Sequence, residues 1–130
     1  MRKIVIVAFI TAAIFVGAEL PPNYYEEMKQ KAPEHLKIVV EASSDRLSGV
    51  NEKRYTIRAK VLEVLRSDTG LKKNDTITIS YRRIFKHPVG WVGPSDPIVL
   101  EERGVYDVYL RRYAEVYSSA ARGWSFRRIR

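Results

Sequence analysis

The sequence predicts a mostly β protein: a small, closed or partly open barrel of five strands with one short helix, following an N-terminal signal peptide. Apolar residues alternate with polar ones along several runs, which is typical of strands that bury one face. Only one short segment has apolar residues at helical spacing. A chain of 130 residues holds one hydrophobic core. Closing the sheet into a barrel removes its exposed edges; an open sandwich is the alternative.

The first eighteen residues have the three-part pattern of a secretory signal. Arg2 and Lys3 supply positive charge, residues 4–16 carry none, and Val16 and Ala18 suit the −3 and −1 positions of a signal-peptidase site. The uncharged run is shorter than the roughly 20 residues of a membrane-spanning helix. We therefore expect cleavage after Ala18 and a secreted or periplasmic protein. An anchor helix that stays uncleaved is the alternative.

A helical segment at residues 19–35 is predicted to precede the barrel domain at residues 36–130. The stretch NYYEEMKQKAP begins with Asn23, which can cap a helix, and Glu26 follows three residues later as in a capping box. Helical spacing puts three apolar side chains on one face, those of Tyr25, Met28 and Ala32. We expect the helix to end at Pro33 and to pack across one end of the barrel.

Period-two alternation predicts five strands, at residues 36–42, 55–65, 76–81, 105–110 and within the closing GWSFRRI. The segment SSDRLSGVNEK, rich in turn-forming residues, is expected to separate the first two. In the second strand the alternation slips by one residue between positions 62 and 65, which indicates a β-bulge. Ile77, Ile79 and Tyr81 of the third strand are expected in the core, and Trp124 and Phe126 are expected on one face of the last strand.

The residues needed for catalysis are not apparent. Cysteine is absent, so thiol chemistry and zinc–thiolate sites are excluded. His35 and His87 have no further metal ligands at suitable spacing, and we expect both to be solvated. No nucleophile elbow or glycine-rich phosphate loop occurs. We therefore predict a non-catalytic protein without a cofactor; a hydrolase with an unrecognised site is the alternative.

Basic and aromatic residues alternate through the C-terminal half of the chain. Loss of Arg2 and Lys3 would lower the formal charge from +8 to about +6, which favours anionic partners. The stretch SDTGLKKNDTITISYRR resembles a nucleic-acid-binding surface in composition. Export argues against nucleic acid, however, and arginines with aromatic residues are equally enriched in protein–protein hot spots.

The predicted partner is therefore another exported or envelope protein. Membrane contact is expected only through an uncleaved signal segment or as a weak surface contact. Trp91 would be an apolar anchor in the long loop KHPVGWVGPSDP, while arginines would donate bidentate hydrogen bonds to carboxylates. The candidate partner-binding residues are Arg82, Arg83, His87, Trp91, Arg111 and Arg112.

Three segments of the chain resemble the netrin-like domain, the OB-type barrel of the tissue inhibitors of metalloproteinases and their prokaryotic relatives. They are YTIRAKVLEVLRSDTGLKKNDTITISY, GPSDPIVLEERGVYDVYL and YSSAARGWSF. The resemblance implies an OB-like barrel that presents loops and an edge to another macromolecule. Animal inhibitors of the family chelate the protease zinc with an N-terminal cysteine, whereas this chain has none and its expected mature terminus is Glu19.

The predicted function is thus an exported, non-catalytic module that binds a protein. One alternative is a binder of polyanions or of the envelope surface, glycans or lipid head groups, that uses the basic segment RGWSFRRIR. A metalloprotease-inhibitor-like protein is another.

Overall fold

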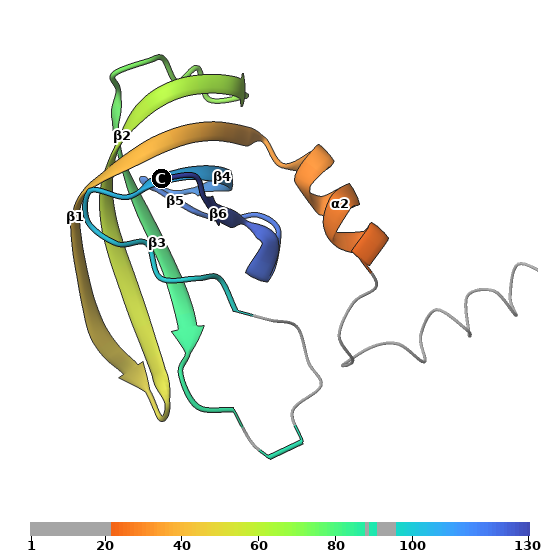
Figure 1. The fold of residues 1–130 in the computed structure, drawn as a ribbon, viewed down its shortest axis with the longest axis vertical. Helices are drawn as coiled ribbons and strands as arrows, with labels where there is room; N and C mark the ends of the chain where they lie inside the picture. Colours follow the sequence, from red (N-terminus) through yellow and green to blue (C-terminus); the bar gives the residue numbers. More distant parts are fainter. Residues whose placement is uncertain (1–21, 88, 91–95) are drawn as a thin grey trace, which may run out of the picture.

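The computed structural model describes residues 22–87, 89–90 and 96–130, and in this part the chain is mostly β with one α-helix, as predicted (Figure 1). The expected signal peptide at residues 1–18 and its cleavage site lie outside the described residues. The helix is α2 (Pro22–Lys31), and a 3-10 helix, η1, covers Arg122–Trp124. The strands are β1 (Glu34–Gly49), β2 (Glu52–Ser67), β3 (Thr76–Ile84), β4 (Val105–Tyr113), β5 (Val116–Ser119) and β6 (Phe126–Arg128).

Five of the strands form a ring. β1, β2, β3, β5 and β4 are neighbours in that order, and β4 pairs with β1 again. All these pairs are antiparallel except β3–β5, which is parallel and has a single paired position, Ile79 with Tyr117. β5 was not among the predicted strands, because its four residues are too few for a clear alternation. The predicted closing strand is β6, which lies outside the ring beside residues 106–108 of β4.

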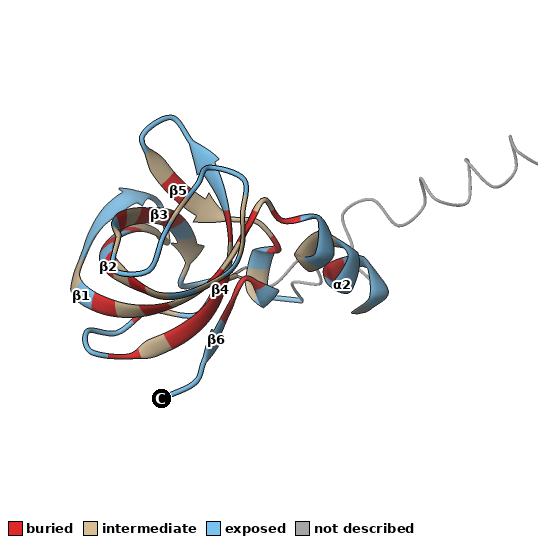
Figure 2. Ribbon diagram, turned by 90° about the horizontal axis from the view of Figure 1, so that it is seen from above, coloured by how far each residue is buried: buried red, intermediate tan, exposed pale blue. Residues whose placement is uncertain are grey.

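The core lies inside the ring and is built from alternate residues of each strand (Figure 2). Ile77, Ile79 and Tyr81 of β3 are buried, as predicted. The core cluster also contains residues from β1, β2, β4, β5, β6 and the loop before β4: Leu36, Ile38, Val40, Tyr55, Ile57, Ala59, Val61, Leu100, Tyr106, Val108, Leu110, Tyr117 and Phe126. Burial of these apolar side chains is the main force that holds a domain without disulfides together.

The first hairpin is longer than predicted. β1 continues past Ala42 to Gly49, and β2 begins at Glu52, so most of SSDRLSGVNEK is strand and only residues 50–51 turn. Pairing along β2 supplies backbone hydrogen bonds to residues whose own strand propensity is low. Asn51 adopts a φ of 60°, a left-handed conformation that asparagine tolerates. The predicted bulge is confirmed, since the β1–β2 register shifts at residues 62 and 65 of β2.

Helix α2 packs against η1 at one end of the ring. It begins at Pro22, a residue well suited to the first helical position, so the expectation that Asn23 caps the helix is wrong. Tyr25 is buried and stacks on Trp124, with ring centroids 5.0 Å apart. Trp124 therefore belongs to η1 and not to the last strand, which corrects its predicted position. No helix within the described ranges is long and apolar enough to cross a membrane.

Tyr81 ties the long loop after β3 to the core. Its buried hydroxyl donates a hydrogen bond to the carbonyl of Ile98 at 3.1 Å and accepts one from the N–H of Leu100 at 3.0 Å. Burial raises the pKa of Tyr81 to about 12, because the charged phenolate is poorly solvated there. The loop is thus fixed by a neutral phenol that satisfies two backbone groups.

This arrangement predicts how stability depends on alkaline pH. The unfolded tyrosine ionises near pH 10.0, whereas folded Tyr81 keeps its proton to about 12. Between these values the unfolded chain releases a proton that the folded chain retains, so stability present below pH 10.0 is lost as the pH rises. We expect a loss of up to about 3 kcal/mol, followed by urea unfolding across this range.

Tyr81→Phe tests the cause of that loss. We expect this variant to be about 1–3 kcal/mol less stable at neutral pH, because two backbone groups lose their partner. Its stability should then fall less steeply than that of the native protein above pH 10.0. Tyr113→Phe, at an exposed tyrosine, is the control and should keep the native slope. Equal slopes for native protein and Tyr81→Phe would contradict the assignment.

Candidate functional site: an arginine-lined groove

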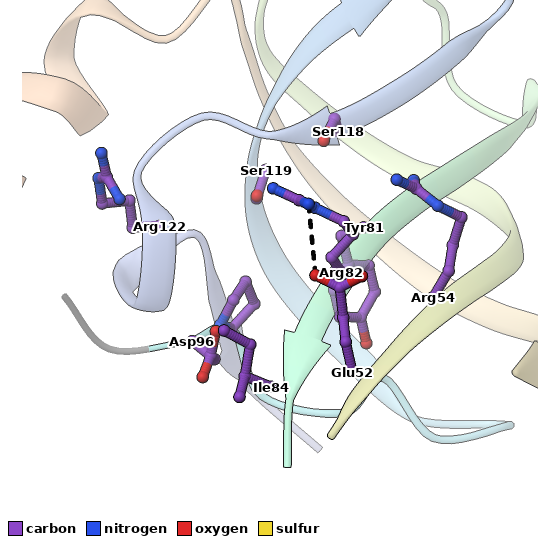
Figure 3. A pocket seen from close by; sticks show the side chains of 10 residues that line it. Glu52, Arg54, Tyr81, Arg82, Ile84, Asp96, Ser118, Ser119 and Arg122 are labelled. Atoms are coloured by element: carbon purple, nitrogen blue, oxygen red, sulfur yellow. Dashed lines mark hydrogen bonds and ion pairs between the residues drawn. The ribbon is translucent and has the colours of Figure 1, made fainter. Parts of the chain in front are cut away.

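Two adjoining hollows lie on the outer side of the ring where β3 meets β5. The first has a volume of about 280 Å³, and Arg54, Arg82 and Arg122 approach it from β2, β3 and η1 (Figure 3). The second, of about 380 Å³, shares Arg54 with it and adds Arg111. Two hydroxyl side chains line both hollows, those of Ser118 and Ser119. We call this surface the arginine groove and define it by Arg54, Arg82, Arg111 and Arg122.

Strand register brings several of these cations together. Arg46 of β1 pairs directly with Arg54 of β2, and Arg54 pairs directly with Arg82 of β3. Tyr55 and Tyr81 are buried, so the arginines that precede and follow them face away from the core. Like charges directly opposite each other on neighbouring strands are destabilising. This row of three arginines therefore carries an electrostatic cost that an anionic ligand would offset.

The positive charge of the groove is only partly neutralised. Arg82 lies 3.3 Å from Glu52, and Arg54 donates a hydrogen bond to the Ser80 hydroxyl at 3.0 Å. Within the part of the chain that the structure describes, Arg111 and Arg122 make no ion pair. The acids that line the first hollow are Glu52 and Asp96. The groove thus combines an excess of guanidinium groups with hydroxyl groups, a chemistry suited to carboxylates and other oxyanions.

The structure brings together only two of the six predicted binding residues, Arg82 and Arg111, at adjoining hollows. Arg83 instead donates a hydrogen bond to the carbonyl of Pro97 at 3.0 Å. Arg112 donates one to the carbonyl of Ala114 at 2.9 Å, within its own hairpin. Neither of these two lines the groove. Trp91 lies outside the described residues.

The expectation that both histidines are solvated is wrong. Nε2 of His87 lies 2.6 Å from Oδ2 of Asp96, and both side chains are largely shielded. Nε2 of His35 lies 2.7 Å from Oδ1 of Asp107, and its ring stacks on Tyr109 with centroids 4.1 Å apart. Burial, together with the Asp107 carboxylate, raises the pKa of Tyr109. His35 and Asp107 are 72 residues apart and meet only through the tertiary fold, whereas His87 and Asp96 are nine residues apart in the loop after β3.

The basic C-terminal segment is more neutralised than its composition suggests. Arg127 lies 3.4 Å from Asp107, and Arg128 lies 3.1 Å from Glu101. The guanidinium of Arg128 also lies over the ring of Tyr106, at 5.7 Å from its centroid. The segment is therefore engaged with the surface of β4 and the loop before it, whereas the groove keeps cations without acidic partners.

Arg54 was not among the predicted binding residues, and Arg122 was predicted only as part of the basic segment RGWSFRRIR of the polyanion alternative. Alternation with buried Tyr55 already puts Arg54 on an outer face, so the sequence held a signal for its exposure but none for its neighbours. Arg122 reaches the groove from η1, whose last two residues were predicted as the start of the closing strand GWSFRRI. Nowhere in the described residues do three or more acidic or histidine side chains gather to hold a metal ion.

No protein-family model, curated protein or solved structure gives a significant match to the chain.

The arginine row predicts a stabilising substitution. Arg46→Gln removes one of two directly opposed like charges, and no ion pair or side-chain hydrogen bond of Arg46 is lost. We expect the free energy of unfolding to rise by about 0.2–1 kcal/mol at low salt, measured by urea unfolding. The gain should shrink in concentrated salt, which screens exposed charges.

Arg58→Gln is the matched control. Arg58 is an exposed strand arginine that faces Ala42 on one side and Thr78 on the other, so it has no opposed cation. Its replacement should leave stability unchanged or slightly lower. A stability loss in Arg46→Gln, or equal effects of the two substitutions, would show that the row is not under electrostatic strain.

Proposed function

We propose that the protein is an exported, non-catalytic binding module whose arginine groove recognises an acidic surface of a protein partner. The observation that carries the proposal is the groove itself: four arginines from different elements line it, and two of them lack an acidic partner among the described residues. Arg111 and Arg122 are exposed and Arg54 is half-buried, so their guanidinium groups can donate hydrogen bonds to a ligand that enters the groove. Their presence at a hollow surface therefore favours a role in ligand recognition.

We further propose that the ring is an OB-like barrel, similar to the netrin-like domain. Its support is the strand order β1-β2-β3-β5-β4 with return to β1, together with the parallel β3–β5 contact. The OB-fold is a five-stranded, partly open barrel whose outer strand face and loops bind extended ligands. The arginine groove occupies the outer face of the strands on either side of the β3–β5 contact.

The groove also has apolar surface, which favours a protein over a simple polyanion. Val116 and exposed Tyr113 line the second hollow beside Arg111. Arginine and tyrosine are the residues most enriched in protein–protein hot spots, where each combines packing with hydrogen bonding. The alternative, polyanion binding through RGWSFRRIR, is weakened because Arg127 and Arg128 already make ion pairs, while Arg122 of the same segment lines the groove.

The proposed setting is the cell envelope or the exterior, where the signal-like residues 1–18 would direct the chain. The partner would then be another exported or envelope protein. Its complementary surface would carry aspartate or glutamate side chains, spaced to receive bidentate hydrogen bonds from the groove arginines.

Affinity capture from the envelope fraction, followed by quantitative mass spectrometry, tests this function. The test variant is Arg111→Gln with Arg122→Gln, because neither arginine makes an ion pair that its removal would break. We expect a partner captured by the native protein to be lost from this double variant, with affinity reduced at least tenfold when measured by calorimetry. Each lost charged hydrogen bond contributes about 1.5–3 kcal/mol, which is consistent with that reduction.

The matched control is Lys72→Gln with Lys73→Gln, which removes the same charge from an exposed turn outside the groove. This control should capture the same partner as the native protein. Equal capture by all three proteins would contradict the site. A polyanion binder would instead show affinity for heparin or polyphosphate that falls steeply with salt in both double variants.

A further inference from the structure

The tip of the β1–β2 hairpin exposes apolar side chains that no other part of the described chain covers. Leu47 is 68% exposed, Val50 is 92% exposed and Phe85, just after β3, is 48% exposed. The N–H of Phe85 donates a hydrogen bond to the carbonyl of Asn51 at 2.9 Å, which joins the end of β3 to the turn. We call Leu47, Val50 and Phe85 the hairpin tip.

The hairpin tip projects beyond the ring and lies at the end of paired strands (Figure 1). Pairing extends to the end of each strand, Gly49 with Glu52 in the hairpin and Glu52 with Ile84 of β3. Three paired strands therefore carry the tip, and its apolar side chains remain exposed to solvent. Exposed apolar groups that are gathered and held in this way mark an interaction surface.

Cations surround the tip. Nζ of Lys53 lies 5.7 Å from the centroid of the Phe85 ring. The acids of the same region are Asp45 and Glu52, and Glu52 is already engaged by Arg82 at 3.3 Å and by the Ser48 hydroxyl at 2.8 Å. Six basic residues outnumber these two acids within residues 45–54 and 82–86: Arg46, Lys53, Arg54, Arg82, Arg83 and Lys86.

We propose that the hairpin tip docks on an anionic lipid surface. Val50 and Leu47 would enter the boundary between head groups and acyl chains, while Arg46 and Lys53 remain at the level of the phosphates. Lysine and arginine side chains favour such positions, since their stems cover apolar surface while their charges stay in water.

A lipid surface fits these observations better than a protein pocket does. Val50 lies in the turn at the end of the hairpin and is 92% exposed, whereas protein hot spots pair a projecting side chain with a shaped pocket. A fluid interface accepts a protruding apolar tip without shape complementarity, and anionic lipid adds attraction of about 1 kcal/mol for each nearby cation. The tip is distinct from the arginine groove, so this inference goes beyond the proposed partner binding.

The absence of cysteine from the sequence allows a direct test. A single cysteine in Val50→Cys, labelled with an environment-sensitive fluorophore, would report whether the tip leaves water. Leu65→Cys is the control, because Leu65 is 47% exposed at the opposite end of β2. The probes are vesicles of phosphatidylcholine alone and of equimolar phosphatidylcholine and phosphatidylglycerol.

We expect the Val50→Cys label to shift its emission to the blue on the mixed vesicles and the Leu65→Cys label not to shift. In sedimentation with the same vesicles, the double variant Leu47→Ser with Val50→Ser should bind roughly tenfold more weakly, because its serine side chains bury less apolar surface in the membrane. Leu65→Ser should bind like the native protein.

Three outcomes would overturn the proposal: no binding to mixed vesicles, equal shifts of both labels, or unchanged sedimentation of the tip double variant. Arg111→Gln with Arg122→Gln should sediment with vesicles like the native protein while losing its captured partner. Failure of lipid docking is therefore distinguishable from failure of the proposed partner binding.

Discussion

Closure of the ring by β1 is the constraint on which the other features depend. Residues 34–39 of β1 pair with β2 along one edge and with β4 along the other. At the start of this segment the carboxylate of Glu34 is completely buried. It accepts hydrogen bonds from the hydroxyls of Ser67 and Thr69, and the Thr69 hydroxyl in turn contacts the Tyr117 hydroxyl at 2.7 Å. The buried, hydrogen-bonded carboxylate of Glu34 thus fixes the end of β2 and is linked through the Thr69 hydroxyl to Tyr117 of β5.

Both proposed binding surfaces follow from this closure. The ladder between β1 and β4 ends at Val39, and Val40 makes the last backbone hydrogen bonds on that edge, with Arg103 and Gly104. Farther along, β1 forms a ladder with β2 alone, and the hairpin extends beyond the ring. On the far side, β3 and β5 share a single paired position, Ile79 with Tyr117. The ring is therefore least continuous beside the arginine groove. Polar side chains can lie on both sides of the β3–β5 contact without interrupting a regular ladder. The two hollows of the arginine groove therefore stay open to a ligand.

The features of this protein that can be predicted from its sequence are those that depend on the local pattern of apolar and polar residues. Alternation located the inward-facing Ile77, Ile79 and Tyr81, and its slip in β2 revealed the bulge, because one-sided burial imposes period two on any strand. The hairpin residues 43–49 have turn-like composition and become strand only because β2 lies beside them. The pair of His35 with Asp107 and the opposed arginines are likewise products of register between strands. A single sequence carries no direct record of that register, so these contacts could not be predicted.

The arginine row links the two surfaces electrostatically. Arg54 and Arg82 line the groove, while Arg46, the third member of the row, lies in the hairpin that carries the tip. Neighbouring strands are about 4.8 Å apart, which separates the outer members of the row by roughly 10 Å. The Debye length at physiological salt is about 8 Å, so each arginine feels the charge of its direct neighbour in the row, whereas the two outer members are largely screened from each other. An acidic ligand in the groove therefore relieves repulsion along the row and at the same time weakens the field that the hairpin presents to anionic lipid. The same cations cannot serve both surfaces at full strength, and this competition follows directly from strand register.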